Sequence, residues 1–229
     1  MEQPSTATNS QKDLQPGSGV LEITDKGYGF LRQAKNDYRA TPGDVFVGKD
    51  HVRHAGLRTG LHIEGLVAAP NKRKAGPKLE VIEKVNGRPA EEYTDIVPFN
   101  EMTVVDPHPQ LKLETRGGPI EMRVLDLVCP IGKGQRGLIV ASPRSGKTIL
   151  LQQIANAIAA NNPECYLFIL LVDERPEEVT DFRRNCPKAE VVASNNDQEI
   201  ANHIRVSEFT VERAKRMAEF GQDVVILLD

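Results

Sequence analysis

Glycine, lysine and threonine stand together at residues 146–148, within the stretch "GLIVASPRSGKTILLQQIANAI". An apolar run precedes them and an amphipathic run follows, which predicts a buried strand at Leu138–Ala141, a tight loop and a helix over Thr148–Ala160. A loop that returns onto the amino end of a helix directs N–H groups at a phosphate. The residues predicted to bind the phosphates are Ser142, Pro143, Arg144, Ser145, Gly146, Lys147 and Thr148.

The residue types suit a nucleotide held with magnesium. Lys147 would reach the β- and γ-phosphates, and the Thr148 hydroxyl would bind Mg²⁺. The pattern GxxxxGK[ST] departs at its first position, where Ala141 replaces glycine. Alanine is the smallest alternative, so the stretch still predicts a site for ATP and Mg²⁺.

Two further carboxylates follow apolar runs. Asp229 ends "VVILLD", and a carboxylate on a strand beside the phosphate loop holds magnesium, partly through water. We expect the natural sequence to continue beyond it. Asp173 and Glu174 follow the run in "LLVDERPEEV", at the edge where open parallel sheets bind ligands. A carboxylate there could activate a water, or both could be ordinary acids at a helix start.

Aromatic and basic residues alternate in the first third of the chain. In "DKGYGFLR", Tyr28, Phe30 and Arg32 fall on one face of a predicted strand. The stretch "GDVFVGKDHVR" adds Phe46 and Arg53. Aromatic rings beside cations can stack single-stranded bases. The alternative is that the rings form the core of a small barrel.

The surrounding sequence divides into four parts. Residues 1–19 are polar and predict a disordered tail. Residues 20–85 hold short apolar runs broken by glycine, which predict a small β-barrel. Residues 86–121 are rich in proline and predict an extended connector. In residues 122–229 apolar strands alternate with helical periods, which indicates an α/β domain with a parallel sheet.

Composition sets broad limits. The chain of 229 residues is 39% hydrophobic and 27% charged, with a formal net charge of −3, which is typical of a globular protein. This charge argues weakly against a nucleic-acid binder, so local clusters must decide. The three cysteines are scattered, and no metal-ligand spacing predicts zinc. No apolar run reaches 18 residues, and we expect a soluble cytoplasmic protein that does not enter a membrane.

The motifs resemble a known family. "DKGYGFLR" and "DVFVGKDHV" resemble the RNA-binding motifs of cold-shock domains, which are OB-fold barrels. Together with "RVLDLVCPIGKGQRGLIVASPRSGKTILLQQIA", "LLVDERPEEVTDF", "EVVAS" and "VVILLD", they make residues 19–229 resemble the transcription termination factor Rho family. The resemblance implies an α/β P-loop domain of the RecA-like class, preceded by an OB-fold, cold-shock-like barrel. It also implies an RNA-dependent ATPase and helicase that forms a homohexamer, binds pyrimidine-rich RNA and acts on the RNA polymerase complex.

The resemblance assigns roles by position. The residues that match the family's RNA site are Tyr28, Phe30, Arg32, Asp44, Phe46 and Arg53. Lys147 and Glu174 match catalytic residues, Thr148 and Asp229 match magnesium-side residues, and Arg175 matches an interface arginine. Arg144 stands where the family commonly has lysine. The family also has an aromatic residue late in the barrel, and in this chain that position falls near Leu79.

Three functions stay open at this point. The first is the RNA-dependent ATPase, and the second is another RecA-like ATPase, which the barrel in front of the core argues against. The third is an RNA-binding module without catalytic turnover. The family's arginine finger and channel loops would lie beyond Asp229. We therefore expect this chain alone to bind RNA, to turn over little ATP and not to form a ring.

Overall fold

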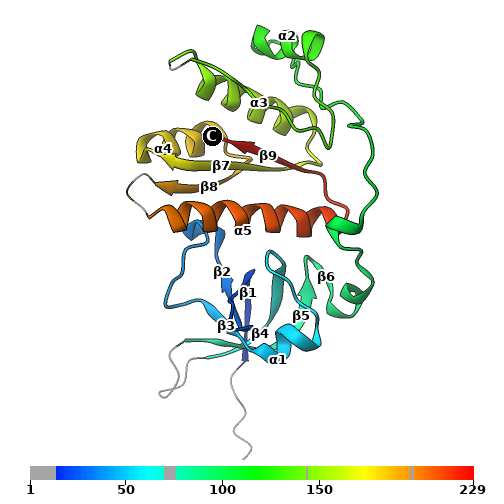
Figure 1. Ribbon diagram of the computed structural model, residues 1–229, viewed down its shortest axis with the longest axis vertical. Helices are drawn as coiled ribbons and strands as arrows, with labels where there is room; N and C mark the ends of the chain where they lie inside the picture. The colour runs from blue at the N-terminus through cyan, green and yellow to red at the C-terminus, as the bar shows by residue number, and fades with distance from the viewer. Residues whose placement is uncertain (1–13, 70–75, 143, 196, 198) are drawn as a thin grey trace, which may run out of the picture.

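The computed structural model describes residues 14–69, 76–142, 144–195, 197 and 199–229. A β-barrel and an α/β domain lie one above the other, and a long connector joins them (Figure 1). The strands are β1 (Leu14–Ile23), β2 (Gly29–Arg32), β3 (Val45–Val47), β4 (His62–Ala68), β5 (Lys78–Val85), β6 (Arg88–Pro89), β7 (Tyr166–Glu174), β8 (Glu190–Asn195) and β9 (Val224–Leu228). The α-helices are α1 (Lys49–His54), α2 (Ile120–Val128), α3 (Lys147–Asn161), α4 (Pro176–Asn185) and α5 (Ile200–Glu219). Short 3₁₀ turns are η1 (Ala34–Asn36), η2 (Ala90–Asp95) and η3 (Phe99–Glu101).

The amino-terminal strands form the predicted barrel. Their order is β3-β2-β1-β4-β5-β6, and β3 also pairs with β5 where Phe46 faces Lys78, which closes the sheet. Leu21, Leu31 and Leu79 are fully buried in its core. At Gly65 an added Cβ would lie 2.0 Å from the Val81 carbonyl oxygen. Only glycine therefore permits the close approach of β4 and β5.

Two predicted boundaries are wrong. The predicted disordered tail overlaps β1, which begins at Leu14 and pairs with β4 from Leu14↔Ala68 onward. The side chains of residues 14–16 are exposed, so backbone pairing orders a segment whose composition predicts disorder. The start of the predicted extended connector is instead folded against the barrel, because Tyr93 of η2 belongs to the buried core.

The α/β domain is built on a parallel sheet in the order β8-β7-β9. Side chains of β7 alternate between its two faces: Phe168 and Leu170 pack in the cluster that includes α5 residues. Leu167 and Ile169 pack with residues of α3 and α4. Burial on both faces explains the continuous apolar run of this strand.

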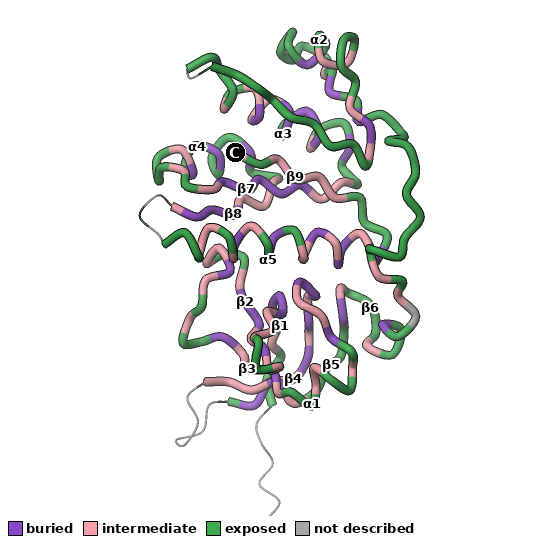
Figure 2. Tube along the Cα trace, viewed as in Figure 1, coloured by how far each residue is buried: buried purple, intermediate pink, exposed green. Residues whose placement is uncertain are grey.

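The predicted strand at Leu138–Ala141 does not form. Leu138 and Val140 are 87% and 86% exposed, and the segment before α3 runs outside the sheet (Figure 2). Among the described residues β9 pairs only with β7, so no strand offers this segment a hydrogen-bonding ladder. The following helix is confirmed: α3 extends one residue beyond the predicted range at each end and buries Leu151, Ile154 and Ile158.

Helix α5 lies between the sheet and the barrel (Figure 1). Val206 and Phe209 pack with the sheet residues Phe168 and Val192. Toward the barrel, the buried Glu219 carboxylate accepts hydrogen bonds from Arg58 at 3.0 and 2.6 Å. Helix α5 thus contacts both domains. Within the described part of the chain, no helix combines the length and the apolar character that a bilayer crossing requires.

Candidate functional site

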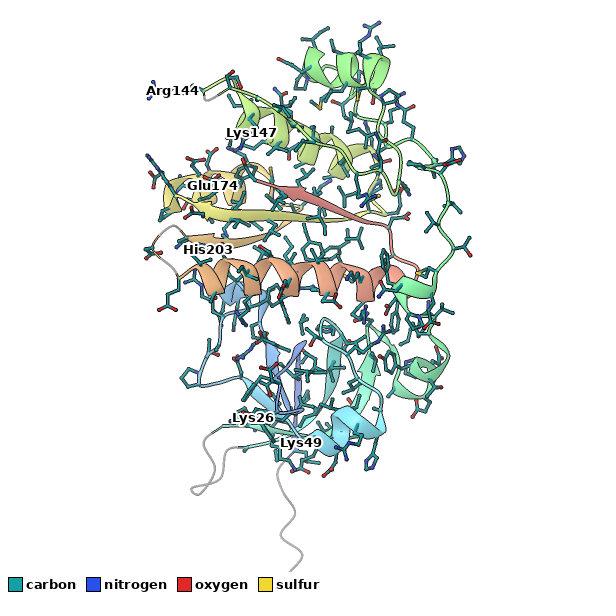
Figure 3. The ribbon with its side chains drawn as sticks, viewed as in Figure 1. Lys26, Lys49, Arg144, Lys147, Glu174 and His203 are labelled. Atoms are coloured by element: carbon teal, nitrogen blue, oxygen red, sulfur yellow. The ribbon has the colours of Figure 1, made fainter. Side chains whose placement is uncertain are left out.

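Three predicted residues meet at the carboxyl edge of the parallel sheet. Glu174 ends β7, Asp229 follows β9, and Lys147 begins α3. The Lys147 ammonium forms an ion pair with the Asp229 carboxylate, whose side chain is 3% exposed. Figure 3 shows Lys147 and Glu174 at this edge, on facing elements. Backbone hydrogen bonds of Asp229 with Leu170 and Val172, at 3.0 and 2.9 Å, fix the carboxylate to β7.

A β-bulge separates the two neighbouring acidic residues of β7. Val172 pairs with Ser194 and Glu174 with Asn195, so Asp173 is an extra residue, with φ of +62°. Its side chain is 67% exposed and lies 3.9 Å from His203 Nε2. Glu174 is half-buried. A bulge redirects side chains, and here it turns Glu174, not Asp173, toward Lys147 and Asp229.

The sequence patterns did not predict a role for His203. This histidine lies in the first turn of α5, and its Nδ1 is 2.8 Å from the Ser194 hydroxyl. With Asp173 on its other nitrogen, it connects α5 to the bulge. The three residues come from three elements, so no local spacing could have identified the group.

The surroundings shift the pKa values of two site residues. Burial, followed by repulsion from Glu178 and Asp229, raises the pKa of Glu174 above its ordinary value, although Lys147 opposes this. The hydrogen bond that the Lys147 ammonium donates to the Asp229 carboxylate raises the pKa of Lys147. Glu174 therefore becomes a stronger proton acceptor in its ionised form, and Lys147 stays a cation.

The phosphate loop keeps an open helix end. Gly146 is the N-cap of α3 with φ of +92°, and an added Cβ would meet nothing within 4 Å. Glycine is thus favoured by its conformation and not by crowding. No described side chain caps α3, so N–H groups of the first turn remain for a ligand, which fits a phosphate. Thr148 is half-buried in that turn.

The other described residues of the predicted loop are exposed to solvent. Ser142 and Ser145 are exposed, and the Ser145 N–H donates to the Ser142 carbonyl oxygen at 3.2 Å. Arg144, with φ of +61°, lies at the loop tip, away from the sheet (Figure 3). Pro143 lies outside the described residues. Arg175 is the exposed N-cap residue of α4, and its interface role stays a prediction.

A second carboxylate group is already occupied by a protein cation. Glu164, Cys165 and Asp223 place their ligand atoms within 4.8 Å of one another. Lys133 Nζ lies 2.7 Å from Glu164 and 2.6 Å from Asp223. The ammonium group fills the position that a metal would need, so this group joins the segment before α3 to the sheet.

The barrel presents three aromatic rings together, and we name this group the aromatic platform: Tyr28, Phe30 and Phe46. Ring centroids are 5.8 Å apart for Tyr28–Phe30, 5.5 Å for Tyr28–Phe46 and 5.8 Å for Phe30–Phe46. All three residues are half-buried, and the barrel core consists of other residues. The alternative that these rings form the core is wrong.

Arg32 and Asp44 are buried beside the platform and are paired with each other, so they are not free surface charges. The Arg32 guanidinium is 5.0 Å from the Phe30 centroid and donates to Asp44 Oδ2 at 2.5 Å. Asp44 is 6% exposed. Glu22, which sequence patterns did not predict, accepts from Arg32 Nε at 2.5 Å. Its signal was an acidic residue within the apolar run "VLEI".

Free cations lie elsewhere on the barrel. Arg53 is exposed on α1, and Lys26 and Lys49 lie at the barrel end remote from the α/β domain (Figure 3). Leu79 is fully buried in the core, so the position where the resemblance implies an aromatic residue contributes no ring to the platform.

Two known protein families match this chain, one over the barrel and one over the α/β domain. The family described as "Rho termination factor, RNA-binding domain" matches residues 17–91. The family described as "ATP synthase alpha/beta family, nucleotide-binding domain" matches residues 121–229. The barrel is therefore an RNA-binding domain by family, and the α/β domain is a nucleotide-binding domain.

Curated relatives match across almost the whole chain. The protein named transcription termination factor Rho in Aquifex aeolicus is 50% identical over 214 residues, which are 92% of this chain and 49% of the relative. The same-named protein of Cereibacter sphaeroides is 47% identical over 216 residues, 93% of this chain and 51% of the relative. The same-named protein of Streptomyces lividans is 46% identical over 224 residues, which are 96% of this chain and 31% of the relative. The chain spans about half the length of the first two relatives.

Proposed function

We propose that this chain, which belongs to the transcription termination factor Rho family, couples RNA binding on its barrel to ATP hydrolysis at its sheet edge. In the whole protein, hydrolysis would drive movement along pyrimidine-rich nascent RNA and end transcription. That protein would be a cytoplasmic homohexamer acting on the RNA polymerase complex. The observation that carries the proposal is that Lys147, Glu174 and Asp229 meet at the carboxyl edge of the parallel sheet. The same chain carries a barrel with an aromatic platform.

The residues at the sheet edge divide the work of hydrolysis. Glu174 orients the attacking water and accepts its proton. Lys147 neutralises charge on the phosphoryl group, for which it must leave its ion pair with Asp229. Thr148 and Asp229 offer the oxygen ligands that Mg²⁺ prefers, and the metal would neutralise charge on the phosphates. Ser142, Ser145 and Gly146 line the same loop, with Arg144 as a second cation and Arg175 as an interface residue.

RNA binding takes place on the barrel and not at the sheet edge. The rings of the aromatic platform stack on single-stranded bases, with roughly 1–3 kcal/mol for each base. Arg53 contributes positive charge for the phosphates. The Arg32 guanidinium lies against the Phe30 ring, and Asp44 holds that guanidinium through a hydrogen bond.

A second candidate is RNA binding without turnover by this chain alone. It is favoured by the ion pair that occupies Lys147 and by the exposed segment at Leu138–Ala141, which leaves the phosphate loop without a supporting strand. A different RecA-like ATPase is a weaker candidate, because the aromatic platform would then have no role.

The test is phosphate release from ATP, with and without poly-cytidine, by this chain and by a chain extended to the length of its relatives. We expect RNA-stimulated release from the extended chain and little from this one. Lys147→Ala in the extended chain should abolish release and leave RNA binding unchanged. Release that survives this substitution would place the phosphate site elsewhere, and brisk release from this chain would remove the second candidate.

A further inference from the structure

An arginine of the nucleotide-binding domain donates hydrogen bonds to Glu22, the residue that pairs with Phe30 of the aromatic platform. We propose that Arg205 of α5 is a positioning residue for RNA binding, which acts across the domain boundary through Glu22. This inference rests on the proposed RNA role of the platform. It adds to that role the claim that the other domain sets the platform's geometry.

The bond between Arg205 and Glu22 is two-pronged. Arg205 Nε donates to Glu22 Oε1 at 2.6 Å, and Nη2 donates to Oε2 at 2.7 Å. Nη2 also donates to the Tyr38 carbonyl oxygen at 2.7 Å, and the start of α5 lies beside the segment that follows β2 (Figure 1). A two-pronged arginine–carboxylate pair restricts the orientation of both groups, so α5 fixes the Glu22 carboxylate.

Glu22 passes this constraint to the platform. It faces Phe30 across the β1–β2 pair and accepts from Arg32 Nε at 2.5 Å. Arg32 in turn lies 5.0 Å from the Phe30 centroid. A continuous line of contacts therefore runs from Arg205 through Glu22 and Arg32 to a ring of the platform.

The charges of this group balance. Arg205 and Arg32 face the carboxylates of Glu22 and Asp44. Burial would raise the pKa of Glu22, but hydrogen bonds from Arg205 and Arg32 outweigh it and lower the pKa, so Glu22 is ionised. Without Arg205, Arg32 would be the one cation of the described chain left between the Glu22 and Asp44 carboxylates, and the Glu22 carboxylate would lose its fixed orientation. Arg32 and the Phe30 ring against which it lies would then lose their single arrangement.

The experiment compares Arg205→Gln with a matched substitution. Arg183→Gln removes another ion pair between the same domains, Arg183 Nη2 to Asp37 Oδ1 at 2.7 Å, and that pair does not include Glu22. Affinity for fluorescent oligo-cytidine is measured for each variant at one salt concentration, and thermal melting checks the fold. We expect Arg205→Gln to weaken binding by about tenfold, since members of one polar network are strongly coupled. Arg183→Gln should stay within twofold.

Two further measurements separate positioning from direct contact with RNA. In the Glu22→Gln background, Arg205→Gln should weaken binding by less than threefold, because its route to the platform is already broken. The dependence of affinity on salt should keep its slope, whereas a lost phosphate contact lowers the slope by about 0.7. If Arg205→Gln alone unfolds the chain, Arg205→Lys, which keeps the charge but loses the two-pronged geometry, takes its place.

The outcomes are distinct. Unchanged binding by the Arg205 variant, with binding weakened by Phe46→Ala, overturns the inference and leaves the RNA site standing. An equal loss in both Glu22 backgrounds, or a reduced salt slope, makes Arg205 a direct RNA contact and also overturns it. Binding that is insensitive to Phe46→Ala, Phe30→Ala and Tyr28→Ala overturns the proposed RNA site, and the inference with it.

Discussion

Asp173 and Glu174 are neighbours in the chain, but the bulge gives their carboxylates different surroundings. Asp173 faces solvent and His203, whereas Glu174 faces the sheet edge. The same contrast holds on the barrel, where Arg32 is buried among carboxylates and Arg53 is exposed. At the scale of the residue, burial and partners decide the role of a side chain more than its type.

The raised pKa of Glu174 predicts a shift in the pH dependence of ATP hydrolysis. Glu178 contributes to that pKa by repulsion and by a hydrogen bond, so Glu178→Gln should lower it. The carboxylate would then ionise at lower pH, and the acid limb of the pH–rate profile of an extended chain should move to lower pH. The exposed neighbour Glu177 supplies the control, Glu177→Gln, which should leave the limb in place. A limb that moves upward would contradict Glu174 as the proton acceptor.

The platform predicts a stacking contribution to RNA binding. Phe46 contacts both Tyr28 and Phe30, as each ring of the platform contacts the other two, so Phe46→Ala removes a stacking surface and support for its neighbours. Affinity for oligo-cytidine should fall by roughly 1–3 kcal/mol, as measured by fluorescence anisotropy. Phe99, 43% exposed on η3, provides the control, and Phe99→Ala should bind as the unchanged chain does.

At the scale of the element, α5 joins the two domains through buried charge. The Glu219 side chain is fully buried and bonds Arg58, Arg216 and the Phe99 N–H. Arg213 of the same helix lies over the rings of Tyr38 and Phe168, which belong to the two domains. These contacts fix α5 to both the barrel and the sheet.

Loss of Glu219 should therefore destabilise the whole chain. Glu219→Ala leaves Arg58 and Arg216 without their buried partner, at a cost of about 3 kcal/mol. The melting temperature should fall by about 6–12 °C, as followed by circular dichroism. Glu212→Ala on the same helix removes a carboxylate that is 35% exposed and pairs with Lys215 and Arg216, and it should cost less than about 1 kcal/mol. Equal losses in the two variants would show that burial of the charge is not the cause.

At the scale of the whole molecule, the two sides of the α/β domain differ in how far they are covered by other elements. The face against the barrel is covered by α5, whereas the segment before α3 is exposed along most of its length (Figure 2). Among the described strands, β9 has a neighbour on one side only. An apolar segment and an unpaired strand edge together favour association between molecules.

This exposure predicts concentration-dependent self-association of the chain. The run "GLIVA" has strong strand propensity and no charge. Replacing Leu138 and Val140 by glutamate should lower the apparent mass measured by light scattering at high protein concentration. Val104 and Val105 are also exposed, at 95% and 74%, but stand between polar residues. Their replacement by glutamate should change the mass little, and an equal effect would mean that general hydrophobicity drives association.

Local patterns were sufficient for a large part of this protein. The sequence predicted helix α3, the apolar strands of the parallel sheet and the residues Lys147 and Asp229, because each depends on a pattern within about ten residues, whereas Glu174 was separated from Asp173 only by the family resemblance. The barrel followed from short apolar runs broken by glycine, and the platform rings followed from their alternation. Such features are local because period and turn chemistry act over neighbouring positions.

Only the tertiary structure decided which of these residues are partners. Backbone pairing with β4 orders Leu14–Gly19, and the lack of a described strand neighbour leaves Leu138 and Val140 exposed. The bulge at Asp173 selects Glu174. Arg205 and Glu22 are 183 positions apart in the chain, and a contact over that separation leaves no periodic trace. Burial and pairing of such distant groups depend on the packing of whole elements, which local propensity does not encode.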